Sequence, residues 1–104
     1  MGDKAVVATI DTSANIRSFC PVVDAIYEVK WVDSFGFFGW VDLSDAEGFE
    51  PSICHTVGYI ISNDGGKIVM TQGQSTSGCV YGAIAIPVVC VQKIVQLYLV
   101  EERE

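Results

Sequence analysis

The side chains best suited to covalent chemistry in this 104-residue chain are one histidine, His55, and four cysteines. A Cys–His pair becomes a nucleophile when the imidazole takes the thiol proton. Cys54 and His55 are adjacent, so on a strand they would point to opposite faces. The chain has no C-x-x-C, no G-x-S-x-G and no phosphate-binding loop, and it offers no set of four zinc ligands. We therefore expect no enzyme, no cofactor, no metal site and reduced, buried thiols. The cysteines are Cys20, Cys54, Cys79 and Cys90.

Carboxylates are the second group of side chains that could hold a ligand. Asp42, Asp45 and Glu47 lie close together in an acidic stretch. A calcium loop requires Asp, Asn and Gly at fixed positions before a bidentate Glu, and this spacing does not match. Asp33 stands apart, and an Asp at such a position commonly binds backbone amides of its own turn. We predict a solvated acidic loop without a bound cation.

Five of the eleven aromatic residues fall within ten positions. They are Trp31, Phe35, Phe37, Phe38 and Trp40, and Gly36 and Gly39 interrupt them. Trp31 continues the alternation of a strand, which places it in the core. Phe37 and Phe38 are consecutive, so in an extended chain only one of them faces inward. For Trp40, core and interface remain open alternatives. Aromatic anchors with a polar rim are typical of binding hot spots. The predicted partner-binding residues are Phe37, Phe38, Trp40, Asp33 and Asp42.

The net charge of the chain indicates which classes of partner it can bind. Six Lys and Arg stand against thirteen Asp and Glu, for a net charge of −7. Nucleic-acid binders neutralise phosphates with Lys and Arg, so this composition weighs against a nucleic-acid partner. Half of the residues are hydrophobic, which favours a folded domain. No apolar stretch reaches the roughly 20 residues of a membrane helix, and no signal-peptide pattern is present. We expect a cytoplasmic protein without a membrane partner.

Period-2 alternation of apolar residues predicts a mainly β protein. The clearest strand is residues 27–32, with Tyr27, Val29 and Trp31 on one face. Asn63-Asp64-Gly65-Gly66 predicts a tight hairpin, because Asn, Asp and Gly accept positive φ. Gly58 predicts a bend or a close backbone approach. Residues 73–78, which are polar and flanked by glycine, predict a longer turn rather than a phosphate site. The predicted strands before the C-terminal segment are 5–10, 27–32, 55–62, 67–72 and 79–86.

Short strands joined by tight turns predict a single domain over residues 1–104, with an N-terminal extension (1–22) and a core unit (23–100). The predicted core unit is a small five-stranded SH3-like or Sm-like barrel. A short helical turn is expected within the 42–50 loop, started by an Asp42 or Ser44 cap. The predicted core residues are Val29, Trp31, Val57, Tyr59, Ile68, Met70, Ile84 and Ile86.

The C-terminal segment, residues 88–100, is apolar nearly throughout. Its many β-branched residues favour a short turn after Pro87 and then a strand through Leu97 or Leu99. Pro87 is also a good first residue of a helix, so a C-terminal helix is the alternative. One small barrel does not need so apolar a tail. We therefore predict that it pairs with or packs on another copy, giving a homo-oligomer.

Several short motifs follow one another along residues 27–97. They are Trp31-x-Asp33-Ser34, Gly39-Trp40, Thr56-Val57-Gly58-Tyr59, Lys67-Ile68-Val69-Met70 and Ile86-Pro87, followed by Ile94 and Leu97. This succession resembles a group of small uncharacterised proteins encoded by bacteriophages and prophages. The resemblance implies a mobile-element protein that works inside a bacterial host cell. It brings no assigned activity, so no functional residue is carried over from it.

Three classes of function are compatible with the sequence. The first is a non-enzymatic interaction module that binds a host protein or another copy of itself through the aromatic loop. The second is an oligomer that binds a small ligand or sequesters a nucleotide, which would require a basic pocket. The third is a Cys–His hydrolase, which would require an exposed cysteine within hydrogen-bond reach of His55. We expect the first.

Overall fold

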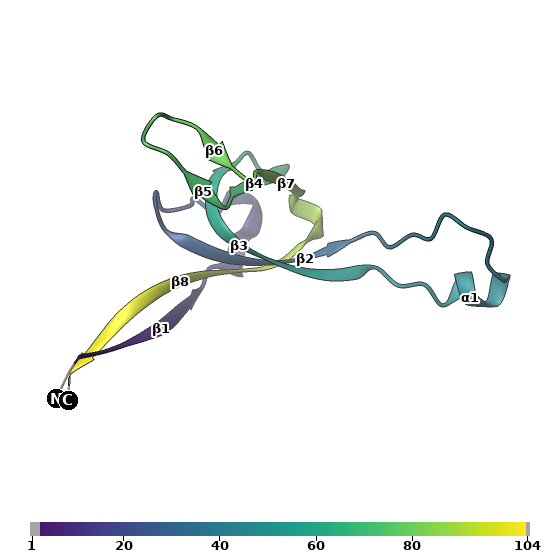
Figure 1. The fold of residues 1–104 in the computed structure, drawn as a ribbon, viewed down its shortest axis with the longest axis horizontal. Helices are drawn as coiled ribbons and strands as arrows, with labels where there is room; N and C mark the ends of the chain where they lie inside the picture. Colours follow the sequence, from purple (N-terminus) through teal and green to yellow (C-terminus); the bar gives the residue numbers. More distant parts are fainter. Residues whose placement is uncertain (1–2, 104) are drawn as a thin grey trace.

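The chain folds around one antiparallel sheet of six strands, in the order β1-β8-β2-β3-β4-β7, with a separate two-stranded hairpin of β5 and β6 (Figure 1). The computed structural model describes residues 3–103. The strands are β1 (Asp3–Asp11), β2 (Ile26–Asp33), β3 (Ser52–Asn63), β4 (Lys67–Thr71), β5 (Gly73–Gln74), β6 (Val80–Tyr81), β7 (Ile84–Pro87) and β8 (Val91–Arg103). The helical segments are the 3-10 turns η1 (Ser13–Ser18) and η2 (Val88–Cys90) and the short helix α1 (Leu43–Glu47). The prediction of a mainly β protein is confirmed.

The sheet is open and does not close into a barrel, so the predicted five-stranded SH3-like or Sm-like barrel is not confirmed. Within residues 3–103, β1 pairs only with β8 and β7 pairs only with β4, which leaves an edge at each end. The three residues of η2 connect β7 to β8 although β2, β3 and β4 lie between these two strands in the sheet. So short a connection requires the sheet to curl strongly. The curl brings β7 near β8, and the two strands remain unpaired.

The core lies on the concave side of this curl. Its buried residues are Tyr27, Val29, Ile60, Ile68, Met70, Ile86, Val88, Val91 and Ile94. Four of the predicted core residues are therefore confirmed as buried, and Trp31 and Ile84 are partly buried against the cluster. The Trp31 indole N–H donates to Oγ1 of Thr56 at 3.0 Å, which satisfies its polar atom.

The predicted core positions on β3 are wrong. Val57 is 48% exposed and Tyr59 is half-buried, and both lie on the opposite face of the sheet. The register explains the error, because it places Tyr27 directly opposite Gly58. Residues directly opposite in an antiparallel pair share a face, so Gly58 faces the core beside the large Tyr27 ring. Ile60, two residues further along, is the apolar side chain that β3 contributes to the core.

Gly58 also allows the close backbone approach that the sequence predicts. A Cβ built on Gly58 would lie 2.3 Å from the carbonyl oxygen of Thr71 at the end of β4. Side chains other than hydrogen do not fit at such a distance from backbone. The absence of a side chain at Gly58 therefore lets β4 fold tightly over β3.

The hairpin predicted at residues 63–66 is confirmed and joins β3 to β4. Gly65 adopts φ +86°, a left-handed conformation that favours glycine. The Asp64 carboxylate accepts hydrogen bonds from the backbone N–H groups of Gly66 and Lys67 and from Lys67 Nζ, each at 2.8 Å. The hydrogen bonds from Lys67, and then that from Gly66, lower the pKa of Asp64 well below its ordinary value.

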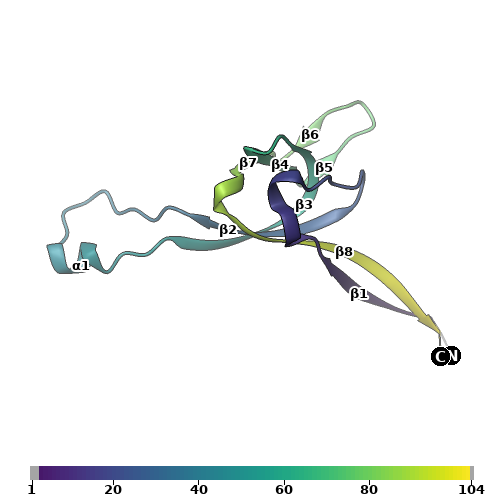
Figure 2. The same ribbon diagram turned by 180° about the vertical axis from the view of Figure 1, so that it is seen from behind.

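The N-terminal residues form part of the sheet rather than lying apart from it. From residue 3 onward, the expected extension supplies the edge strand β1 and then η1, whose Ile16, together with Phe19 just beyond it, packs against the core. The Asn63 amide donates to the carbonyl oxygens of Ile16 and Phe19 at 2.8 and 3.0 Å. Figure 2 shows η1 lying next to β3 and β4. These contacts attach the segment to the hairpin.

The C-terminal segment forms a strand, so the helical alternative is wrong. The short turn expected after Pro87 is η2, and β8 then continues beyond the predicted end near Leu99 to Arg103. The short helical turn expected in the 42–50 loop is confirmed as α1. Beyond Leu97, β8 pairs only with β1, and the two strands leave the sheet as a ribbon. The ribbon and the α1 loop project in opposite directions (Figure 1), and the molecule measures 61 × 35 × 28 Å.

Candidate protein-binding arm

A long connection between β2 and β3, residues 34–51, extends away from the sheet and carries α1 at its tip (Figure 1). We call it the arm. No residue of the arm is buried. Near α1 its backbone is held by three hydrogen bonds, from the N–H groups of Ala46, Gly48 and Phe49 to carbonyl oxygens within the arm, at 3.0 to 3.1 Å. The arm therefore has a defined end but no hydrophobic core of its own.

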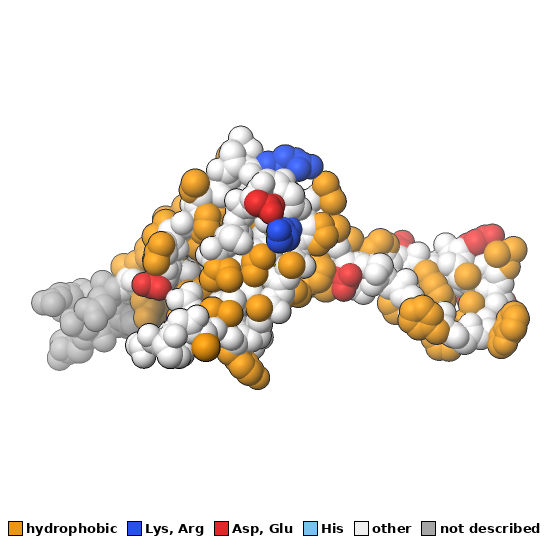
Figure 3. Space-filling model, turned by 90° about the horizontal axis from the view of Figure 1, so that it is seen from above, with side chains coloured by type: hydrophobic (Ala, Val, Ile, Leu, Met, Phe, Trp, Pro, Cys, Tyr) orange, Lys and Arg blue, Asp and Glu red, His pale blue; other side chains and the backbone are white. Residues whose placement is uncertain are grey.

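The predicted binding rings lie on this arm and are exposed. Phe37 is 58% exposed, whereas Phe38 and Trp40 have 104% and 102% of their reference areas accessible. Hydrophobic side chains gather at the far end of the arm (Figure 3). Core and interface were equal alternatives for Trp40, and its full exposure excludes the core of this chain. Large apolar side chains that gather in the open mark interaction sites.

The two glycines of the aromatic segment lie against the neighbouring phenylalanine rings. A Cβ on Gly39 would lie 2.6 Å from the Phe37 ring, and one on Gly36 would lie 3.6 Å from the Phe38 ring. The Phe37 ring therefore rests directly on the Gly39 backbone. Glycine thus has a packing role here that complements its flexibility.

Phe35 and Phe49 join the two sides of the arm. Their rings meet edge to face, with centroids 5.2 Å apart and an interplanar angle of 90°. Such aromatic pairs contribute about 0.5–1.5 kcal/mol beyond the area they bury. Phe35 lies near the start of the arm and Phe49 near its end. The contact therefore holds the outgoing and returning segments of the arm together, while the Phe38 and Trp40 side chains remain exposed.

The two predicted rim carboxylates occupy different places. Asp42 precedes α1 without making a side-chain cap, and it borders a shallow hollow of about 480 Å³ with Trp40, Val41 and Asp45. Asp33 ends β2 at the base of the arm, where its carboxylate accepts the N–H of Ser34 at 2.8 Å. The structure therefore brings Trp40 and Asp42 together and leaves Asp33 apart.

The residues suited to covalent chemistry do not assemble. The contact found for His55 is with Glu28, with 3.6 Å between Nδ1 and Oε1. All four cysteines are free thiols. The prediction that they are buried is wrong, because Cys20 and Cys79 are exposed while Cys54 and Cys90 are half-buried. Across residues 3–103, no group of three or more His, Cys, Asp or Glu side chains is placed to hold a metal ion.

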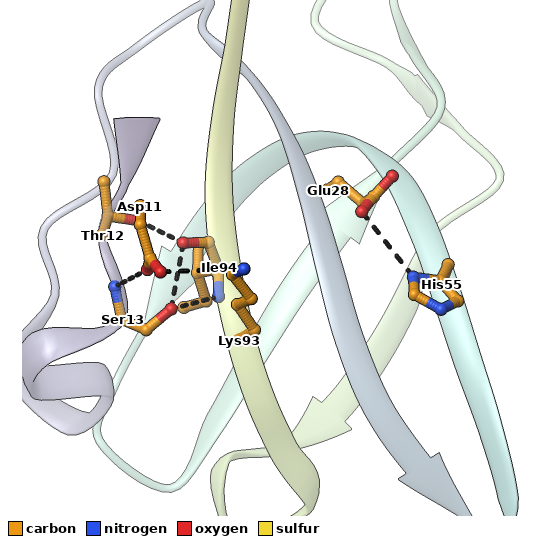
Figure 4. Close-up of polar contacts among 7 residues, drawn as sticks. All are labelled: Asp11, Thr12, Ser13, Glu28, His55, Lys93 and Ile94. Carbon is orange, nitrogen blue, oxygen red and sulfur yellow. Dashed lines mark hydrogen bonds and ion pairs between the residues drawn. The ribbon is translucent and has the colours of Figure 1, made fainter. Parts of the chain in front are cut away.

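The structure shows a polar cluster that the sequence analysis missed. Lys30 of β2 lies directly opposite Lys93 of β8 on one side and His55 of β3 on the other. With Glu28 and Val95 they line a shallow hollow of about 230 Å³. Figure 4 shows Glu28 next to His55 and Lys93 next to Asp11. These residues are far apart in the sequence, and only the strand register brings them together.

Comparison with known protein families, curated proteins and solved structures finds no match for this chain. In the part of the chain that the structure describes, no helix is both long and apolar enough to span a membrane.

Proposed function

We propose that this protein is a non-enzymatic interaction module that binds a partner protein through the arm. The observation that carries the proposal is the complete exposure of Phe38 and Trp40 at the end of a projecting segment. Burial of an apolar side chain of this kind contributes roughly 1.5–3 kcal/mol, and each ring that stays in water loses this contribution. A partner that covers the rings recovers this free energy on binding.

The chemistry of the arm defines the surface that would fit it. The exposed apolar residues Phe38, Trp40 and Leu43 lie among the carboxylates of Asp42 and Asp45. The complementary surface is an apolar cleft with Lys or Arg at its rim, which a protein provides and a nucleic acid does not. The resemblance to phage and prophage proteins leads us to propose a cytoplasmic protein of a bacterial host as the partner.

Thermal denaturation and site-specific crosslinking together test this proposal. Phe38→Ala and Trp40→Ala are expected to unfold within about 0.5 kcal/mol of the parent, as exposed substitutions do. Phe19→Ala is the matched control, because Phe19 packs edge to face on buried Tyr27, and it should destabilise the fold clearly. If both arm variants melt far below the parent, the rings belong to a folded core and the binding surface is elsewhere.

A photo-crosslinking residue at position 38 should then give a discrete adduct in host cells. The same probe at Val89, which is 76% exposed on η2, is the control for surface crosslinking. Truncating a hot-spot ring typically weakens binding by about 2 kcal/mol or more, so Trp40→Ala should remove the position-38 adduct. An adduct pattern that is identical at positions 38 and 89 would contradict a specific site on the arm.

A further inference from the structure

The central sheet has a second apolar face, opposite the core. On β3 and β8, and at Ile26 of β2, residues that alternate with the core positions are also apolar, and the register aligns them across the strands. We call this surface the outer face. Its apolar residues are Val7, Ile26, Val57, Tyr59, Val95, Leu97 and Leu99, and its polar centre comprises Glu28, Lys30, His55 and Lys93. Val7 is 65% exposed and Leu99 is 72% exposed.

No described element covers the outer face. In Figure 1 the 3-10 turns, the β5–β6 hairpin and the curled strands β4 and β7 lie above the centre of β2, β3 and β8, and the β1–β8 ribbon and the arm extend away from this centre to either side. A groove of about 550 Å³ at one end of the face is lined mainly by apolar residues, among them Val7, Ile26, Leu97 and Leu99. A two-stranded ribbon is marginally stable in water without a further layer. The outer face and the ribbon therefore need a cover.

The charges at the centre of the outer face indicate what that cover is. The basic residues Lys93, Lys30 and His55 form one row across three strands, and Glu28 lies in the next row between two valines. Like charges directly opposite each other on a sheet are destabilising. The contacts of these basic residues with carboxylates in the same chain are long, at 3.6 Å from His55 to Glu28 and 3.8 Å from Lys93 to Asp11 (Figure 4). Lys30 has no carboxylate within 4.0 Å among the described residues.

We propose that the outer face is a twofold interface with a second copy of this chain. A twofold interface uses the same patch on both subunits, so the patch must be complementary to itself. Adjacent rows of opposite charge meet this condition. A twofold axis that runs across the strands between the rows sets Glu28 of each copy against Lys30 and Lys93 of the other. The same axis sets the apolar row of Ile26, Tyr59 and Leu97 against Val32 and Ile53 of the other copy, which continue the outer face on β2 and β3. The two sheets then form a face-to-face sandwich with a second hydrophobic core.

The dimensions of the outer face suit such a dimer. Four strands about 4.8 Å apart and about eight residues long, at roughly 3.3 Å per residue, give a flat area of roughly 500 Å². The accessible area is larger than this flat area, because side chains project from the sheet and the ribbon adds its apolar side. A stable interface buries about 800 Å² per partner, and the outer face approaches this size. Phe38 and Trp40 lie beyond the paired rows, so the dimer leaves them available for the proposed partner.

Light scattering coupled to size-exclusion chromatography tests the dimer over a dilution series of the full chain. The expected mass is twice the 11.3 kDa of one chain. Ile26→Asp should weaken the dimer roughly a hundredfold, because it buries a charge in the interface. Val80→Asp on β6 is the matched control, since Val80 is 47% exposed and Ile26 is 41% exposed. The control should dimerise like the parent.

A charge exchange tests the twofold pairing itself. Glu28→Lys alone and Lys30→Glu alone each place like charges across the interface and should weaken the dimer roughly tenfold or more. The double variant E28K/K30E restores both pairs and should recover most of the parent's affinity. Circular dichroism confirms the fold of each variant.

Several results would overturn this interface. They are a parent of single-chain mass throughout the dilution series, an Ile26→Asp variant that is folded and still dimeric, and a folded E28K/K30E variant that stays as weak as the single variants. Phe38→Ala and Trp40→Ala should dimerise normally. Failure of the arm to bind a partner and failure of the outer face to dimerise are therefore separate outcomes.

Discussion

The curled half of the sheet and the arm both contain aromatic residues and glycines, but the sheet buries its aromatic ring whereas the arm exposes its rings. Tyr27 in β2 is fully buried, and its hydroxyl accepts the Val22 N–H at 2.9 Å, whereas Trp40 on the arm is fully exposed. In both regions a glycine lies close to a neighbouring group, Gly58 against the Thr71 carbonyl and Gly39 against the Phe37 ring. The difference lies in what surrounds each aromatic ring. Strands on several sides enclose Tyr27, while the arm offers a single layer of chain.

The largest expected effect comes from replacing Gly58 in the curled half with alanine, and Gly39→Ala on the arm is the comparison. Gly58→Ala places a methyl group 2.3 Å from a backbone oxygen, and neither partner can move without breaking the sheet. Overpacking of this kind typically costs about 1–3 kcal/mol, and we expect a cost at the upper end of this range because the obstructing atom belongs to the backbone. Gly39→Ala meets a ring atom at 2.6 Å, but the ring belongs to a partly exposed, rotatable side chain. Urea denaturation should show a large loss of stability for Gly58→Ala and a small one for Gly39→Ala.

Equal losses in the two variants would remove the distinction between the regions. Large losses in both would mean that the arm is packed as firmly as the curled half. Small losses in both would mean that β4 does not lie against β3 at Gly58.

A smaller effect of opposite sign is expected at Thr71. Its side chain is 1% exposed, and its hydroxyl has no hydrogen-bond partner among the described residues. Val has almost the same shape and no polar atom, so Thr71→Val should stabilise the fold by about 1 kcal/mol. For a domain of this size that corresponds to a rise in melting temperature of roughly 4–8 °C. A lower melting temperature would show that the hydroxyl has a partner in solution.

The smallest effect concerns pH. The folded state lowers the pKa of Asp64, chiefly through its hydrogen bonds with Lys67, from the ordinary value of 3.8. The stabilisation is therefore fully present above pH 3.8 and is lost as the pH falls toward the lowered pKa. Asp64→Asn should reduce the pH dependence of stability below about pH 4. Asp45→Asn on the arm removes a charge without such a network and is the control. Acid curves with the same slope for the parent and Asp64→Asn would contradict this linkage.

The sequence predicts a strand well where only one face is apolar. On β2, Glu28 and Lys30 alternate with Tyr27, Val29 and Trp31, so the buried side is evident from the pattern. On β3 both faces carry apolar residues, and the pairing of Tyr27 with Gly58 decides which face is inside. That pairing is a long-range property. The openness of the sheet depends on long-range pairing in the same way, because it follows from β1 and β7 lying at opposite edges of the sheet without pairing with each other.

The arm and the outer face also differ in whether the local sequence is enough to predict them. The exposure of Phe38 can be predicted from the local sequence, since consecutive residues of an extended segment cannot share a face. The outer face has no local signal, because Lys30, His55 and Lys93 meet only through the register of three strands. The apolar tail predicted self-association from the sequence, whereas the surface that we propose for it could be identified only from the structure.

The elongated outline of the molecule affects how its mass must be measured. A compact domain of 104 residues has a radius of gyration of about 13 Å, whereas this chain has 17.7 Å because the arm and the ribbon extend from opposite ends. An extended particle diffuses more slowly than a sphere of equal mass and leaves a gel-filtration column earlier. A single chain would therefore elute where a larger globular protein is expected. Light scattering, which reports mass independently of shape, is the measurement that separates a long monomer from a dimer.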